Sequence, residues 1–461
     1  MLLEMQAHSK KKVTLLVTTL GSFIIPFMSS SVNVALPSIA KEFAMDVVLM
    51  NWVVMAFLLM TAASLVPFGR IADLYGRKKI FAYGLIIYTI FSLLSATSTS
   101  PILIILYRAF QGVGGAMIFA TATAILASVF PSFERGKALG INAASIYLGL
   151  SLGPSLGGFM TQNFGWRSLF ILNALIALIT IIIVFLKLSD EWAEAKGERF
   201  DLTGSTVYGV ALVVLMYGVS LLPYESGLLL TTIGGLGIIA FIIWESKTKS
   251  PVINISLFRK NTAFAFSNLA ALINYSATFA VGYLLSLYLQ NVKGLGPQYT
   301  GIVLLTQPIT MAVFSPVAGK LSDRIEPRIL ASAGMALTTV SLLLFSSLSE
   351  QTAINFIAAN LLLMGLGFGL FSSPNTNAVM SSVEKKFYGV ASATLATMRS
   401  VGQMLSTGIV TTIFAVYMGR VQITPESFPV FIKSVNLVFI IFSALCFVGI
   451  FASLARGKLR S

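Results

Sequence analysis

The sequence predicts an all-α integral membrane protein with fourteen membrane-spanning helices, and three observations lead to this fold class. Hydrophobic residues make up 56% of the 461 residues and charged residues only 10%, whereas charged residues make up about a quarter of a soluble protein. Apolar stretches of about 20 residues, long enough to cross a bilayer as helices, recur along the whole chain. Two of the polar connections between them resemble each other, which indicates an internal repeat.

The fourteen predicted helices are separated by short polar connections. In chain order they cover residues 13–36, 47–68, 80–97, 101–125, 138–160, 168–187, 205–222, 228–245, 262–289, 300–319, 329–348, 353–377, 389–418 and 430–455. The first is preceded by the basic segment MLLEMQAHSKKK, which lacks the small-residue cleavage pattern of a signal peptide. We therefore expect the first helix to be retained.

Lysine and arginine gather on one side of the predicted membrane. Of the 31 such residues, two lie inside helices and five lie in connections of the opposite side, namely Lys41, Arg167, Lys293, Arg420 and Lys433. The positive-inside rule places the richer side in the cytoplasm, and both termini with it. This distribution accounts for the net charge of +14 without a nucleic-acid partner. We expect a multi-pass protein of the cell membrane.

The internal repeat relates the stretch GRIADLYGRKK, from Gly69, to GKLSDRIEPR, from Gly319, with Asp73 opposite Asp323. Each stretch follows the second helix of a six-helix group, which predicts two pseudo-equivalent bundles with two extra helices between them. Such a repeat is typical of transporters that work by alternating access about a central cavity.

These groups divide the chain into three predicted domains. They are an N-terminal six-helix bundle (1–187), a charged linker with two additional helices (188–261) and a C-terminal six-helix bundle (262–461). The linker begins with LSDEWAEAKGERFD, and we expect this segment to be a solvated connection on the cytoplasmic surface.

Several kinds of site are excluded by composition. The single cysteine, Cys446, lies in an apolar run, so one chain has no disulfide and no thiolate metal site. The single histidine, His8, lies in the N-terminal tail, which excludes a histidine-based proton relay. No nucleotide-binding loop of the type G-x-x-x-x-G-K-[ST] is present. We expect neither an enzyme nor a cofactor.

A series of short motifs recurs in a specific order. They are VNVALP (32–37), NW (51–52), GRIADLYGRKK (69–79), RAFQGVGGA (108–116), GLSLGPSLGG (149–158), GWRSLFILN (165–173), FDLTG (200–204), LF (257–258), the second-half GKLSDR and SSPNTN…RSVGQ (372–403). Together they resemble the major facilitator superfamily, and within it the fourteen-helix drug:proton antiporter family of multidrug, quaternary-ammonium and tetracycline exporters. The resemblance covers nearly the whole chain and implies the major facilitator fold.

The first copy of the repeated stretch has the residues of a gate. Glycines allow a tight turn between closely packed helices, and an aspartate can accept hydrogen bonds from the positive N-terminal end of a neighbouring helix. The resemblance implies a cytoplasmic gate that holds the outward-open state. Its predicted residues are Gly69, Asp73, Gly76, Arg77 and, as a weaker second copy, Asp323.

The fifth predicted helix carries a ridge of small residues. Gly149, Gly153 and Gly157 are four residues apart and form a flat surface on which another helix can pack closely, while Pro154 permits a kink. In the family that the chain resembles, this motif marks exporters rather than importers.

Two arginines lie inside predicted helices. A guanidinium within a membrane costs about 3 kcal/mol and needs partners. Arg108 has Gln111 three residues later on the same face, and Arg399 has Gln403 four residues later. The resemblance makes Arg108 part of the proton-coupling machinery, and Arg399 with Gln403 is a candidate anion site. The alternative is that these arginines cap carbonyls or extend to the interface.

The first predicted helix carries a stripe of uncharged polar residues within about 100° of one another. They are Thr14, Thr18, Ser22, Ser29 and Asn33, whereas Ser31 points away. The resemblance implies that this stripe borders the central cavity, although serines and threonines also pack well between helices. Met28, Gln307 and Asn375 are further candidates for the cavity.

An expected carboxylate is missing from the first helix. In the family that the chain resembles, an acidic residue commonly lies five positions before the asparagine, where this chain has Met28. None of the seventeen acidic residues lies well inside a predicted helix. An exporter of cations usually needs such a carboxylate, so the absence puts cationic substrates in doubt.

Three functions remain open. The first is a proton-coupled exporter of hydrophobic drugs or metabolites, with protons handled by Arg108 and water or by acids near the mouths, such as Asp46 or Asp73. The second is a transporter of an anionic metabolite that need not be coupled to protons. The third, a non-transporting sensor or scaffold, would need neither repeat nor gate. The expected partners are membrane lipids, a small hydrophobic or amphipathic substrate and protons, and we expect a monomer.

Overall fold

A computed structural model describes residues 2–45, 47–222, 224–248, 251–253, 255–418 and 425–457. These residues form helices joined by short connections, with no strand among them. In this part of the chain, fourteen helices are long and apolar enough to cross a membrane. The predicted fold class is confirmed.

The helices follow the predicted order. Those before the second half are α1 (Leu2–Glu42), α2 (Val47–Tyr75), α3 (Arg77–Ala96), α4 (Pro101–Val129), α5 (Ser132–Phe164), α6 (Arg167–Lys187), α7 (Leu202–Ser220), α8 (Glu225–Lys247) and the short α9 (Ile255–Lys260). Those of the second half are α10 (Thr262–Thr278), α11 (Val281–Leu287), α12 (Pro297–Ser322), α13 (Pro327–Phe345), α14 (Ile354–Ser381), α15 (Tyr388–Tyr417) and α16 (Phe428–Ala455).

One predicted helix is divided. The sequence predicts a single helix over 262–289, but the structure breaks it between α10 and α11 and ends it in a π-helical turn, Tyr288–Val292. Together these pieces still make one span, Thr262–Val292. Average hydropathy detects the span but not a local change in backbone conformation.

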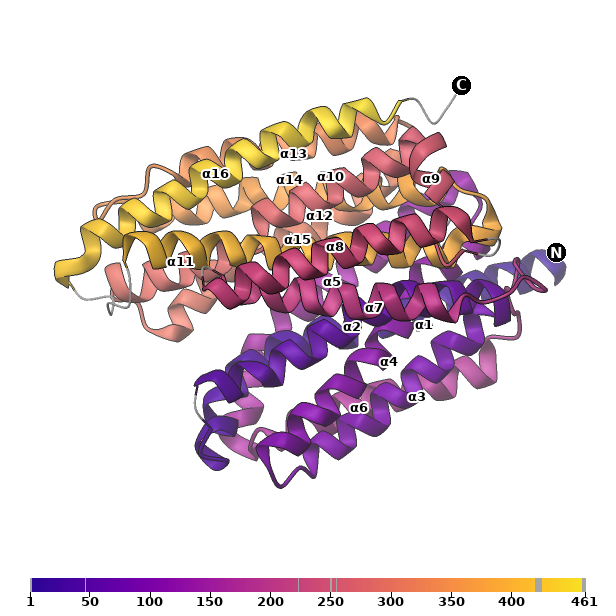
Figure 1. Cartoon of the computed structure of the whole chain (residues 1–461), viewed down its shortest axis with the longest axis horizontal. Coiled ribbons are helices and arrows are strands. Elements are labelled where there is room, and N and C mark those ends of the chain that lie inside the picture. Colours follow the sequence, from indigo (N-terminus) through magenta and orange to yellow (C-terminus); the bar gives the residue numbers. More distant parts are fainter. Residues whose placement is uncertain are drawn as a thin grey trace.

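The two six-helix groups are arranged as a V. Figure 1 shows α1–α6 and α10–α16 converging at the end of the molecule where both termini lie and diverging toward the other end. The groups meet where α5 packs on α12 and where α2 and α4 pack on α15. We call the end at which α2 passes into α3 the Asp73 end.

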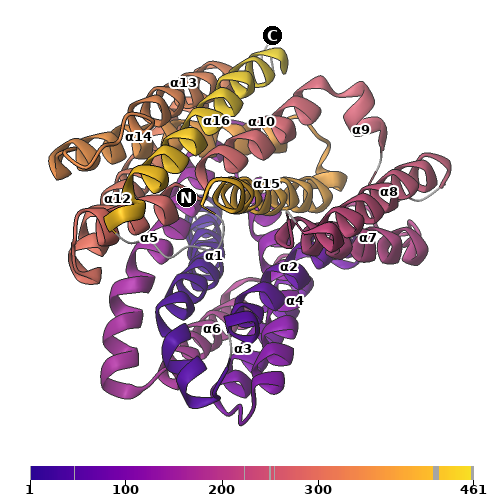
Figure 2. The same cartoon turned by 60° about the vertical axis from the view of Figure 1, so that its left-hand side comes forward.

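The two extra helices lie outside the groups, over one of the contacts between them. Figure 2 shows α7 and α8 beside α2 and α15, and α7 packs against both. The hydroxyl of Tyr208 in α7 lies 3.1 Å from that of Thr397 in α15. The side chain of Asp201 caps α7 by accepting a hydrogen bond from the main-chain N–H of Gly204 (2.9 Å).

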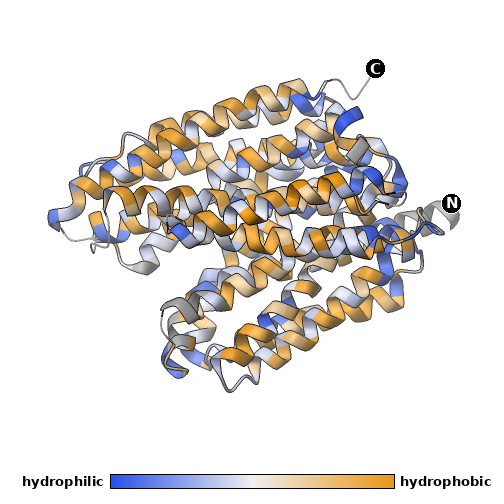
Figure 3. Cartoon of the chain, viewed as in Figure 1, coloured by the Kyte–Doolittle hydropathy of each residue, from blue (hydrophilic) through white to orange (hydrophobic). Residues whose placement is uncertain are grey.

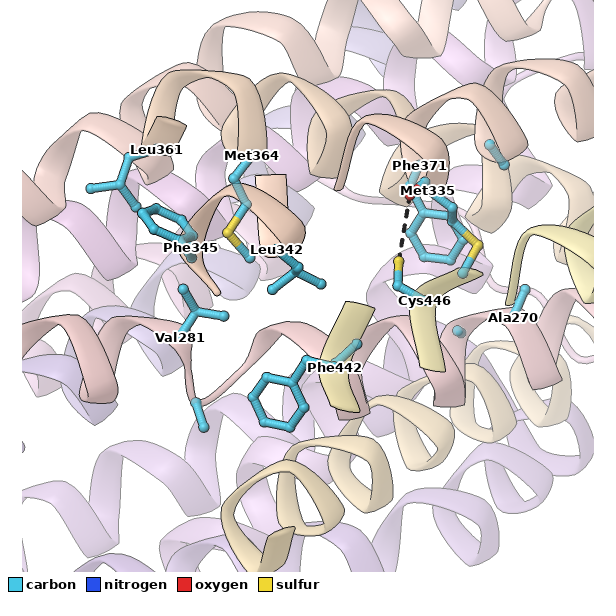
Figure 4. Packing of buried hydrophobic residues seen from close by; sticks show 14 of the residues in the cluster. Ala270, Val281, Met335, Leu342, Phe345, Leu361, Met364, Phe371, Phe442 and Cys446 are labelled. Carbon is cyan, nitrogen blue, oxygen red and sulfur yellow. Dashed lines mark hydrogen bonds between the residues drawn. The ribbon is translucent and has the colours of Figure 1, made fainter. Parts of the chain in front are cut away.

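Apolar residues cover the long sides of the molecule. Figure 3 shows them along the length of the helices, with hydrophilic residues gathered toward the helix ends. Many large hydrophobic side chains are exposed, as a surface that faces lipid requires. The largest buried cluster among the described residues lies mostly in the second half and extends to α4 and α5 of the first. It includes Met335, Phe442 and Cys446, whose thiol donates a hydrogen bond to the carbonyl of Met335 (Figure 4).

Candidate functional site

The Asp73 carboxylate joins the two halves at the Asp73 end. It is fully buried and accepts hydrogen bonds from the main-chain N–H groups of Gly389 (2.8 Å) and Val390 (3.0 Å) at the start of α15. The positive end of the helix dipole and the Arg77 guanidinium, 2.7 Å away, both favour the negative charge. The hydrogen bonds expected of Asp73 are therefore present.

Two glycines shape the end of α2, one at its contact with α15 and one in the turn that follows. A Cβ atom added to Gly69 would lie 2.6 Å from the Cβ of Ala393 and 2.6 Å from the carbonyl oxygen of Gly389. Gly76 lies between α2 and α3 with a φ of 121°, a conformation that favours glycine. A side chain at Gly69 would therefore force α2 and α15 apart, and one at Gly76 would strain the backbone.

Asp323 makes an equivalent connection between α12 and α5. Its carboxylate accepts hydrogen bonds from the main-chain N–H groups of Gly136 (2.7 Å) and Lys137 (3.0 Å) near the start of α5. Gly319 and Gly136 lie so close that neither has room for a Cβ atom. The sequence predicts a weaker second copy, but the structure gives both aspartates the same pair of bonds.

A tyrosine between two arginines reinforces the first connection. The ring of Tyr388, at the start of α15, has the guanidinium groups of Arg77 and Arg135 at 5.4 Å each. Arg77 also donates hydrogen bonds to Ser128 (2.7 Å) and to the carbonyl of Lys385. Sequence reasoning missed Tyr388, because an aromatic residue at a helix start gives no signal of its own.

The glycine ridge of α5 packs on α1. Cβ atoms at Gly149, Gly153 and Gly157 would all collide with α1, and the hydroxyl of Ser31 donates a hydrogen bond to the carbonyl of Gly153 (3.0 Å). The side chain of Pro154 is exposed. Ser31 therefore serves close packing, and because it lies outside the polar stripe this contact does not bear on the role of the stripe.

The polar stripe of α1 divides into two parts. Thr14, Thr18 and Ser22 are buried, whereas Ser29 is half-buried and Asn33 is exposed. Ser22, in the buried part, lines a cavity between the two halves that is described below.

The structure corrects the expectation for Met28. Its side chain is fully buried in an apolar cluster with Val53, Ile104, Trp166 and others. It therefore points into the first half and not into the cavity between the halves. The reason is helix periodicity: Met28 lies 100° around the helix from Ser29, on the face that packs against α2, α4 and α6.

A cavity of about 20 Å³ lies between the two halves. Its lining comes from α1, α4, α5 and α15: Ser22, Phe119, Thr123, Asn142, Ile146, Ser392, Leu395, Ala396 and Arg399. This is room for about one water molecule. Polar groups from both halves therefore meet at a point that only a small ligand can enter in this conformation.

Arg399 connects this cavity to a group of aromatic rings. Its guanidinium donates a hydrogen bond to the hydroxyl of Thr376 (2.8 Å) and lies 5.6 Å from the ring of Tyr275. Phe368 packs edge-on against Tyr275 (5.3 Å) and Tyr147 (6.0 Å). The Nε atom of Arg399 has no hydrogen-bond partner among the described residues. This group, which we call the arginine–aromatic site, has the chemistry to bind a flat ligand that carries an acceptor, but in this conformation Tyr147 and Phe368 are buried against each other.

The remaining predicted site residues have the following places. Gln403 is half-buried one turn from Arg399, and Gln307 is half-buried in α12. Asn375 is buried and donates a hydrogen bond to the carbonyl of Ser267 (3.1 Å), which ties α14 to α10. Asp46 lies outside the described residues.

Arg108 lies in the interior of the first half. It is buried, donates hydrogen bonds to the carbonyl of Val53 (3.1 Å) and to Gln111, and lies 4.4 Å from the ring of Phe57. Gln111 in turn donates to Ser92. The Nη2 atom of Arg108 has no partner among the described residues. The two helical arginines thus belong to separate sites.

Comparisons with known proteins agree with this geometry. The family model described as the Major Facilitator Superfamily matches residues 18–407 and, in a second match, 267–460. The riboflavin transporter RibZ of Clostridioides difficile (strain 630) is 29% identical over 96% of this chain and 96% of its own length. The multidrug resistance protein Stp of Mycobacterium tuberculosis (strain CDC 1551 / Oshkosh) is 30% identical over 88% of this chain and 76% of its own length.

A third relative and one solved structure extend the comparison. The tetracenomycin C resistance and export protein of Streptomyces glaucescens is 27% identical over 88% of this chain and 77% of its own length. The crystal structure of the human organic anion transporter MFSD10 superposes with a TM-score of 0.71 and 14% identity, over 96% of this chain and 99% of that one. At this identity the likeness concerns the fold alone.

Proposed function

This chain belongs to the major facilitator superfamily, and from that premise we propose that it is a proton-coupled exporter of hydrophobic aromatic compounds that carry no net positive charge. It works by alternating access, with the Asp73 end in the cytoplasm. The fold and the transporter class are given by the family. The substrate class and the coupling are the proposal.

The observation that carries the substrate class is the arginine–aromatic site. Tyr275, Phe368 and Tyr147 offer ring faces and edges for stacking, and the Arg399 guanidinium attracts an acceptor or a negative charge. A cation would be repelled by Arg399. It would also find no carboxylate among the described residues that line the adjoining cavity.

The relatives are consistent with this class. One is named a riboflavin transporter, and two others are named for multidrug resistance and for tetracenomycin C resistance and export. Export is further supported by the motif GLSLGPSLGG of α5, because the resemblance implies that this motif marks exporters.

The conformational cycle follows from the connections at the Asp73 end. In this structure both aspartates bind the opposite half, at Gly389 and at Gly136. Opening toward the cytoplasm requires that both pairs of bonds break and that Tyr388 separates from the arginines beside it. We propose that Asp73 and Asp323 are paired gates and that Arg108 with Gln111 couples this motion to protons.

A second candidate is a transporter of an anionic metabolite without proton coupling. It is favoured by the free Nε of Arg399 and by the lack of an acidic partner for Arg108 among the described residues, since a guanidinium rarely releases its proton. The two candidates differ in driving force and not in the binding site.

Flux into proteoliposomes under separately imposed pH and voltage gradients tests both. The substrates are a lipophilic cation, riboflavin as an uncharged aromatic compound and an aromatic carboxylate. We expect transport of the last two driven by the pH gradient. Transport of the carboxylate alone, insensitive to the pH gradient, would favour the second candidate, and transport of the cation at an equal rate would overturn the substrate class.

A further inference from the structure

The connection between α6 and α7 lies against the turn between α2 and α3. The sequence predicts that LSDEWAEAKGERFD is a solvated connection, but its residues 191–198 bind five residues of the gate sequence: Arg70, Asp73, Arg77, Lys78 and Lys79. We call residues 191–198 the strap. The strap is largely exposed, as expected of a solvated connection, but it is also bound to the gate sequence by hydrogen bonds and an ion pair. These contacts leave no pattern in the sequence.

The strap caps α3. The Glu191 carboxylate accepts hydrogen bonds from the main-chain N–H groups of Lys78 (2.9 Å) and Lys79 (3.2 Å), which have no partner within a helix that begins at Arg77. Gly76 has no side chain that could cap the helix, and a Cβ atom at this position would collide with the Glu191 carboxylate. A residue 115 positions later in the chain thus takes the place of the usual N-cap side chain.

The strap also holds the backbone of the two residues that bind the second half. The carbonyl of Asp73 accepts a hydrogen bond from the N–H of Ala195 (3.0 Å), and the N–H of Arg77 donates to the carbonyl of Trp192 (2.9 Å). The side chains of Asp73 and Arg77 reach α15 and the carbonyl of Lys385. Each of these residues therefore binds the strap through its backbone and the second half through its side chain.

An ion pair fixes the far end of the strap. The Arg70 guanidinium, which is buried, lies 2.6 Å from the half-exposed Glu198 carboxylate. Arg70 precedes Asp73 by one helical turn, so this pair holds the last turn of α2 on which Asp73 stands.

The equivalent turn in the second half is built differently. Helix α13 begins with Pro327, which has no N–H that needs a cap. The residues before it bond within their own turn, as Ile325 N–H does with the carbonyl of Leu321 (2.8 Å). The strap therefore serves one gate and makes the two gates unequal.

We propose that Glu191 and Glu198 are positioning residues, and that the strap aligns Asp73 and Arg77 with α15 and so sets how readily the cytoplasmic gate opens. The inference rests on the proposed gate at Asp73. It assigns a role to the strap, a segment between the two repeats. The gate sequence itself does not predict this role.

Hydrogen–deuterium exchange tests the contact directly. In Glu191→Ala, the amides of Lys78 and Lys79 should exchange about three- to tenfold faster, because each loses a charged hydrogen-bond acceptor. The matched control is Glu194→Ala, since Glu194 is exposed in the same strap and has no hydrogen bond shown to the described residues. Unchanged exchange at Lys78 and Lys79 in Glu191→Ala would overturn the proposal.

Distances between spin labels test the effect on the gate. Labels at the exposed positions Phe133 and Glu384, on opposite halves at the Asp73 end, are introduced with Cys446→Ser so that no other thiol is present. Glu191→Ala should raise the cytoplasm-open population about three- to tenfold, and Glu194→Ala should leave it unchanged. Faster exchange without a change in this population would refute the positioning role.

A charge exchange controls for misfolding. Arg70→Glu and Glu198→Arg should each raise the open population, and the double variant should restore it, because the ion pair is rebuilt in reverse. The positioning role would also be refuted by two results together: the double variant does not restore the cytoplasm-open population, and Glu191→Ala does not change it. None of these readouts needs a substrate. A failure to find transport would therefore count against the proposed function but not against the proposed role of the strap.

Discussion

The carboxylate of Asp73 and the main-chain N–H of Gly389 lie 2.8 Å apart, and this hydrogen bond joins the end of α2 to the start of α15 across the two halves. Asp323 and Gly136 repeat the relationship at 2.7 Å between α12 and α5. In both cases an aspartate binds the N-terminal region of a helix in the opposite half. The repeat in the sequence therefore corresponds to a repeat of inter-half contacts.

Asp73→Asn should open the gate at the Asp73 end. The amide keeps the shape of the side chain but loses the charge that the α15 dipole and Arg77 stabilise, and hydrogen bonds to charged groups contribute about 1.5–3 kcal/mol. We expect kcat to fall at least about tenfold with a smaller change in KM, measured as substrate flux in proteoliposomes. A larger effect on KM than on kcat would contradict a gate.

Gly69→Ala should prevent closure at the Asp73 end. The added Cβ would lie 2.6 Å from the Cβ of Ala393, so α2 and α15 must separate. We expect a larger cytoplasm-open population in spin-label distances. Gly235→Ala is the matched control, because a Cβ at Gly235 in α8 meets nothing within 4 Å. Equal behaviour of the two variants would exclude close packing as the reason for Gly69.

Arg399→Gln should discriminate between substrates. The change removes the positive charge beside Tyr275 and keeps a hydrogen-bond donor near Thr376. We expect KM for an aromatic carboxylate to rise about tenfold or more and KM for an uncharged aromatic compound to change less. Arg399→Lys should retain part of the anion transport. Equal losses for both substrates would place Arg399 in a structural role.

Arg108→Ala should abolish flux driven by the pH gradient and leave a folded protein. Arg108 binds Gln111 and the carbonyl of Val53 inside the first half, away from the arginine–aromatic site. Arg167→Ala is the control, since Arg167 is partly exposed and bound to Glu42 outside the interior of the first half. Normal pH-driven flux in Arg108→Ala, with an unchanged melting temperature, would show that Arg108 only supports the fold.

Met28→Asp should destabilise the protein without conferring cation transport. Met28 is enclosed by apolar side chains, so a carboxylate there is buried at a cost of about 3 kcal/mol. Met28→Leu, which conserves volume, should change stability by less than about 1.5 kcal/mol. Thermal unfolding in detergent and cation flux give the two readouts. A stable variant that exports a lipophilic cation would show that position 28 reaches the transport pathway.

The sequence predicts many residues of the site, and those that it does not predict are missed for physical reasons. Asp73, Gly69 and Asp323 could be identified because their chemistry depends on their own side chains or on the lack of one. Their partners could not, because Gly389 and Gly136 contribute main-chain N–H groups that every residue except proline possesses. Of the arginine–aromatic site, the sequence predicts Arg399 but not the aromatic residues around it.

The sequence by itself determined the fourteen helices, their order and the two-fold repeat, because apolar length and helical periodicity are properties of each segment alone. Only the tertiary structure decided what each face meets. It placed Met28 inside the first half, Ser31 against the glycine ridge and Glu191 on the start of α3. Periodicity gives the direction of a side chain from its own helix axis. Its partner depends on how helices distant in the sequence rotate and pack, and no single segment encodes that.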